Sequence, residues 1–118
     1  MSRRTAVRAA SAVIGVWGSG LLAAPDRVTR LVCGGGPEPR SWVVRVLGAR
    51  LVAQHGLVLV RPTRGVVLLG AVVDAVHALS MVAVGASWSE YRRPAWVSGA
   101  TAAASAAIGV LAARAADR

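Results

Sequence analysis

The chain has 118 residues, enough for one domain, and combines 55% hydrophobic residues with only 16% charged ones. Its net charge is +9 and all 14 basic residues are arginine, but these arginines lie singly or in pairs between apolar runs. That distribution excludes the continuous basic face and the aromatic stacking surface of a nucleic-acid-binding protein. It is typical of a membrane protein whose arginines flank its spans.

The first apolar run covers residues 5–24, about the 20 residues that an α-helix needs to cross a bilayer. Ser11, Gly15 and Ser19 recur every four positions, a spacing that lets two helix backbones approach closely in lipid. We interpret the run as an uncleaved membrane helix and not as a signal peptide, because three more apolar runs follow it. The glycines and prolines after it predict a loop over residues 25–40.

Three further apolar runs, at residues 42–60, 65–87 and 95–113, are also predicted to be membrane helices. The four-residue link 61–64 is short enough to make the second and third helices antiparallel neighbours. The expected fold is therefore an all-α, four-transmembrane-helix bundle with short loops, formed by residues 1–118 as a single integral membrane domain.

Four crossings place both chain termini on the same side of the membrane. That side carries seven arginines and the opposite side five, so the positive-inside rule favours cytoplasmic termini in a multi-pass protein of the plasma (inner) membrane. The seven are Arg3, Arg4, Arg8, Arg61, Arg64, Arg114 and Arg118.

The second and third runs contain polar residues whose insertion into the lipid interior is energetically unfavourable. Counted at 1.5 Å per residue from the link 61–64, Arg50 lies about 15 Å and Asp74 about 13 Å deep, both near the middle of the membrane. Each alone costs about 2.5–3.5 kcal/mol on insertion scales. Asp74 is the one acid inside an apolar run, so we predict that it pairs with Arg50. Gln54 shares a helix face with Arg50, and His77 shares one with Asp74.

The predicted polar cluster of Arg50, Gln54, Asp74 and His77 has two readings. In the first, the ion pair is structural and fixes how the two helices dock, since buried pairs can specify register. In the second, the cluster accepts protons or binds a substrate, because ionisable groups inside a membrane are functional candidates by default. The residues alone leave both readings open.

Enzymatic activity is not expected. Asp74, His77 and Ser80 resemble a catalytic triad, but positions six apart on a helix point about 120° away from each other. We expect no metal site and no cofactor, because Cys33 is the sole cysteine and no recognised spacing of ligands or phosphate-binding glycine loop is present.

Three stretches of the sequence carry a resemblance to a known group of proteins. LAAP at 22–25, RVLGAR at 45–50 followed by Gln54, and VDAVHALSM at 73–81 resemble small, uncharacterised four-helix integral membrane proteins of actinobacteria. The likeness covers most of the chain. It implies a membrane location and four helices, and the family lends no established activity.

Two hypotheses about function follow. The first is a non-enzymatic membrane protein whose partners are the bilayer and other membrane helices, either a homo-oligomer or an accessory subunit of a larger complex. It rests on the small-residue faces of the first and fourth runs, which need a partner helix. The alternative is a small proton-coupled transporter that uses Asp74 with Arg50 or His77.

Overall fold

The computed structural model describes residues 2–115, so Arg118 of the arginine count lies outside the described part of the chain. Within that part the protein is all-helical, which confirms the predicted fold class, and each predicted span agrees with its helix to within three residues at both ends. Four of the helices, α1, α3, α4 and α5, are long and apolar enough to cross a membrane. The elements are α1 (Arg3–Ala23), α2 (Pro25–Cys33), α3 (Ser41–Val60), α4 (Arg64–Ser87), the 3₁₀ turn η1 (Ser89–Tyr91) and α5 (Arg92–Ala115).

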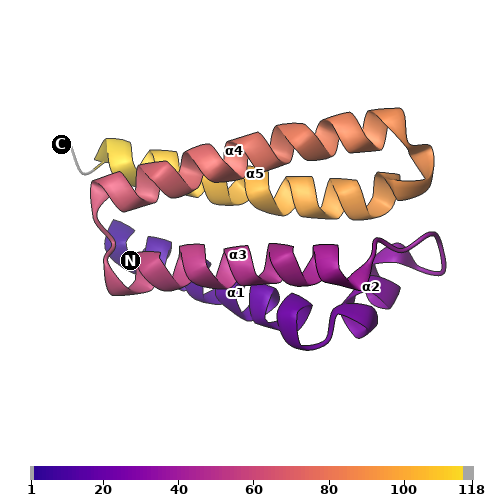
Figure 1. Cartoon of the computed structure of the whole chain (residues 1–118). Helices are drawn as coiled ribbons and strands as arrows, with labels where there is room; N and C mark the ends of the chain where they lie inside the picture. Colours follow the sequence, from indigo (N-terminus) through magenta and orange to yellow (C-terminus); the bar gives the residue numbers. More distant parts are fainter. Residues whose placement is uncertain (1, 116–118) are drawn as a thin grey trace.

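The four long helices are arranged as two pairs (Figure 1). Helix α1 packs along α3, and α4 packs along α5, so we call these the α1/α3 pair and the α4/α5 pair. Helices α3 and α4 are antiparallel, as the short link between them predicts, but they make few contacts with each other. The start of α1, the end of α5 and the α3–α4 link lie at one end of the bundle, and α2 lies at the other (Figure 1).

Close contacts between helix backbones hold the α1/α3 pair together. A Cβ atom on Gly48 of α3 would lie 2.6 Å from the carbonyl oxygen of Gly18 on α1, so neither position has room for a side chain. In the α4/α5 pair, a Cβ atom on Gly99 would lie 3.0 Å from the Cβ of Met81. Gly18 and Gly99, from the faces that were expected to contact partner helices, therefore pack inside the chain, whereas Ser19 is exposed.

The loop expected over residues 25–40 is wrong for its first nine residues, which form α2. Pro25 ends α1, but it also suits the first turn of a new helix, where its missing N–H has no partner to lose. The helix ends at Gly34, whose φ of 57° is left-handed and favours glycine. The segment between Gly34 and Ser41 is the true loop, and Ser41 donates a hydrogen bond of 2.6 Å to Asp26 on α2.

The short connection expected between the apolar runs 65–87 and 95–113 is also partly helical. Ser89–Tyr91 form the 3₁₀ turn, and α5 begins at Arg92, two residues before Pro94. Pro94 still lies in the first turn of α5, where proline is tolerated.

The space between the two pairs changes along the bundle. Near the end with the α3–α4 link, Val7, Val58 and Val67 form an apolar cluster that joins α1, α3 and α4. The middle holds polar side chains, and the end beneath α2 holds a large apolar cavity. The pairs are thus joined by an apolar cluster at one end, and at the other end a cavity lies between them while α2 contacts α5.

Candidate functional site: a polar cluster between the helix pairs

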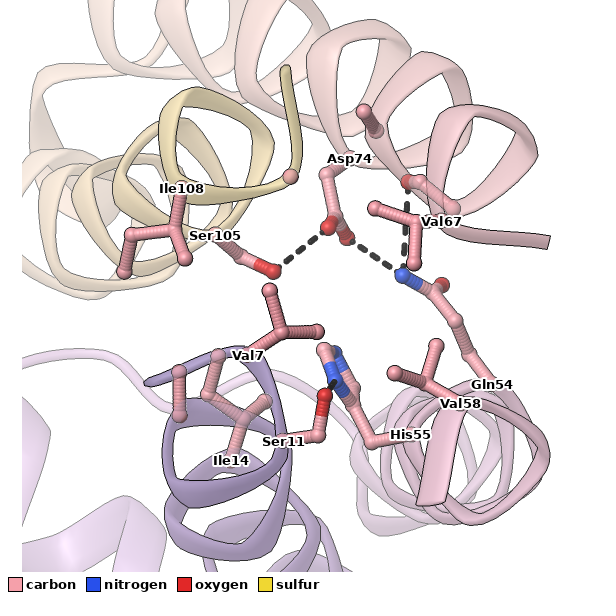
Figure 2. Close-up of a pocket in the computed structure, with 14 residues that line it drawn as sticks. Val7, Ser11, Ile14, Gln54, His55, Val58, Val67, Asp74, Ser105 and Ile108 are labelled. Carbon is pink, nitrogen blue, oxygen red and sulfur yellow. Dashed lines mark hydrogen bonds between the residues drawn. The ribbon is translucent and has the colours of Figure 1, made fainter. Parts of the chain in front are cut away.

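Asp74 is the most deeply buried polar side chain of the described residues, with 2% of its surface exposed. It lies near the middle of α4 and points into the space between the two pairs (Figure 2). Its position follows from helix periodicity, since Val67, Gly70 and Ala71 on the same face of α4 are also buried.

Both carboxylate oxygens of Asp74 accept a hydrogen bond (Figure 2). Ser105 of α5 donates its hydroxyl to Oδ2 at 2.7 Å, within the same helix pair. Gln54 of α3 donates its amide to Oδ1 at 3.1 Å, from the other pair, and to the backbone oxygen of Gly70 at 3.3 Å. Asp74 therefore connects the α4/α5 pair to the α1/α3 pair.

Arg50 lies at the same depth as Asp74, but the distance between the two charged groups is long for an ion pair. Its Nη1 is 3.8 Å from Oδ1 of Asp74, longer than the 2.7–2.9 Å of a charge-assisted hydrogen bond, and it donates instead to Oε1 of Gln54 at 3.3 Å. Its Nε and Nη2 atoms are buried without a hydrogen-bond partner among the described residues. Gln54 thus stands between the guanidinium and the carboxylate and contacts both.

His77, the fourth predicted residue, lies one turn along α4 from Asp74 and bonds elsewhere. Its Nε2 shares a hydrogen bond of 2.7 Å with the hydroxyl of Ser98 on α5. Ser80 donates to the backbone oxygen of Val76 on its own helix and is exposed. Asp74, His77 and Ser80 therefore do not converge on one point, and the structure offers no triad there.

A second buried histidine adds to the site. His55 of α3 has 4% of its surface exposed, and its Nδ1 lies 3.2 Å from the hydroxyl of Ser11 on α1. It lines the same cavity of about 30 Å³ as Asp74 and Gln54, and its Nε2 has no hydrogen-bond partner among the described residues (Figure 2). A polar space of this size holds about two water molecules.

The sequence prediction did not include Ser11, Ser98 or Ser105 in the site. A signal for the last two was present: they are seven residues apart, two helical turns, and so lie on the same face of α5. What the sequence could not provide is the rotation of α5 that turns this face toward α4.

The side chains at the site limit the chemistry that it offers. Across residues 2–115, no three His, Cys, Asp or Glu side chains are grouped so that they could hold a metal ion. The site offers instead one carboxylate, a guanidinium, two imidazoles and a set of hydroxyl and amide donors.

Comparison with known proteins gives no match. No protein-family model, no curated protein and no solved structure is significantly similar to this chain. The resemblance to actinobacterial membrane proteins stays a prediction.

Proposed function

We propose that the protein is a small proton-coupled transporter, in which Asp74 takes up and releases the proton while the two helix pairs move against each other. The observation that carries the proposal is the position of Asp74. Among the described residues it is the one carboxylate in helices α1, α3, α4 and α5, and it is hydrogen-bonded to both pairs.

Protonation of Asp74 affects its hydrogen bonds and its ion pair differently. Ser105 and Gln54 can both keep their hydrogen bonds with a neutral carboxyl group. The attraction between Asp74 and Arg50 is lost, because it requires the negative charge. A proton on Asp74 therefore weakens the link between the pairs and leaves each pair intact.

The other charged or titratable groups near Asp74 are few. Arg50 and His55 face it from α3 and His77 from its own helix, while α1 and α5 contribute the hydroxyl groups of Ser11 and Ser105. Each histidine already has a serine partner. Asp74 is thus the group whose change of charge alters a contact between the pairs.

The arrangement of the bundle supports a hinge. The valine cluster and the α3–α4 link join the pairs at one end, and at the other end a cavity lies between them, where α2 contacts α5 (Figure 1). We place the protein in the plasma membrane with cytoplasmic termini, following the excess of arginine on that side. In this orientation the cavity lies toward the outer face.

The distance between the pairs, measured against pH, tests the proposal. Spin labels on α3 at Val46 and on α4 at Val82, both exposed to lipid and far from the link, report the separation in a Cys33→Ala background. Lowering the pH stepwise until Asp74 takes up its proton is expected to shift the distance distribution to longer values, because the protonated carboxyl no longer attracts Arg50. Asp74→Asn is expected to hold the longer distances throughout the pH series.

Two controls separate this from a general effect of pH. Labels at Val16 and Val46 report distances within the α1/α3 pair and should not respond. Glu90→Gln removes an exposed acid outside the spans and should leave the response unchanged. A wild-type distance that is independent of pH, or a response that survives in Asp74→Asn, contradicts the proposal.

The hypothesis of an oligomer or accessory subunit stays a prediction, and only part of the surface on which it rested is free, as Ser19 is exposed. Other residues of those glycine and serine faces are occupied by contacts within the chain: Ser11 with His55, Gly18 with Gly48, and Ser98 with His77.

A further inference from the structure

A large cavity lies at the end of the bundle opposite the α3–α4 link (Figure 1), and we call it the end cavity. It measures about 440 Å³, within the range of roughly 300–1,000 Å³ found for small-molecule sites. Its walls come from all five helices, with side chains such as Trp17, Leu47 and Met81. It is partly open, so a molecule could enter it from the surroundings.

The inner end of the end cavity is closed by His77 and Ser98. These two side chains are hydrogen-bonded to each other, and they also line a smaller cavity that contains Arg50 and Asp74. The His77–Ser98 pair therefore separates the end cavity from the polar cluster. Because this pair satisfies its own hydrogen bond, the inner part of the cavity is suited to hydrocarbon.

The outer end of the end cavity is different, because it carries positive charge. Arg40 is the only charged residue that lines the cavity, and the hydroxyl-bearing ring of Tyr91 lies at the same end. No acidic residue of the described chain lines it. The segments at this end of the bundle contain five arginines and three acids, and one of those acids, Asp26, is bonded to Ser41.

We infer that the end cavity binds a single-chain amphiphile with an anionic head group, with the hydrocarbon chain against Met81 and Leu47 and the head group beside Arg40. A single chain suits the volume, which is near the lower end of the small-molecule range. As a statement about the transported molecule, the inference rests on the proposed function. As a statement about binding, it can be tested without any transport.

Cys33 provides the reporter for a test, because it is the sole cysteine and lines the end cavity. Burial raises the pKa of its thiol, Glu38 raises it further and Arg93 opposes the shift, so a smaller fraction is thiolate and alkylation is slow enough to follow. The rate of reaction with N-ethylmaleimide is measured at pH 8 in phosphatidylcholine nanodiscs, with and without hexadecanoate. We expect hexadecanoate to slow the reaction about tenfold, because the bound chain covers the thiol.

Three comparisons identify the head group. Hexadecanol and hexadecylamine should each slow the reaction less than about twofold, because neither supplies an anion for Arg40. Arg40→Gln should remove the protection by hexadecanoate. Arg27→Gln is the matched control, since Arg27 lies at the same end but does not line the cavity. An unchanged rate without ligand shows that each variant is folded.

Each outcome bears on the inference. Equal protection by the alcohol or the amine overturns the anionic head group, and no protection by any of the three compounds overturns the binding site. Failure here is distinct from failure of the proposed function. Protection by hexadecanoate without a pH-dependent distance leaves a binding site in a protein that is not proton-coupled, and the reverse result leaves a proton-coupled protein with a different ligand.

Discussion

The interface inside the α1/α3 pair and the interface between the pairs differ in which parts of the chain make the contact. Inside the α1/α3 pair, Gly18 and Gly48 bring two backbones into direct contact. Between the pairs, α3 and α4 touch little, and the contact at mid-membrane is made by the side chains of Gln54, Arg50 and Asp74. Backbone contacts contain no titratable group, whereas contacts to a carboxylate change when it gains a proton. Under the proposed function, we therefore expect the pairs to move as rigid bodies and the junction between them to be the adjustable part.

The largest loss of stability is expected when the backbone contact between α1 and α3 is disrupted. Gly48→Val places a side chain where a Cβ already lies 2.6 Å from a carbonyl oxygen, so the two helices must move apart. Overpacking of this kind costs about 3 kcal/mol. The folded fraction in mixed micelles, measured against increasing SDS, should fall accordingly.

Gly56→Val is the matched control for this prediction, because it makes the same change on the same helix at a position with no neighbour within 4 Å. It should leave the folded fraction close to that of the wild type. Equal loss in both variants would show that valine disturbs α3 itself and that the contact with α1 is unimportant.

A smaller effect should distinguish the two bonds to Asp74. Gln54→Leu removes the bond between the pairs, and Ser105→Ala removes the bond within the α4/α5 pair. Each should cost about 1 kcal/mol, the usual range for hydrogen bonds between membrane helices. Only Gln54→Leu should broaden the distance distribution between Val46 and Val82. Broadening in Ser105→Ala alone would place the adjustable junction inside the pair.

Most of the fold could be predicted from the sequence, because long apolar runs and short polar links are local signals. The four spans were recognised from length and hydropathy alone, and the link 61–64 gave the antiparallel order of α3 and α4. The pairing of α1 with α3 was not accessible, since it depends on Gly18 and Gly48 meeting across 30 positions of sequence. Helix α2 was missed because Pro25 can end one helix and begin another.

The candidate site was predictable in part for a similar reason. Depth is a linear count along a helix, so the sequence could place Arg50 and Asp74 at one level, where the structure brings them to 3.8 Å. It could not show that Gln54 stands between them or that His77 turns to Ser98, because both depend on rotations of helices about their own axes.

The central claim is that the charge of Asp74 serves movement and is not merely scaffolding, and the folded yield in membranes of two variants tests it most directly. The variants are Asp74→Asn and Asp74→Asn combined with Arg50→Leu. We predict that Asp74→Asn alone folds with a yield close to the wild type, because an asparagine amide can still bond to Gln54 and Ser105, while the pH response of the pair distance is lost. Loss of folding in the single variant, with recovery in the double variant, would contradict the account and make Arg50 and Asp74 a structural ion pair.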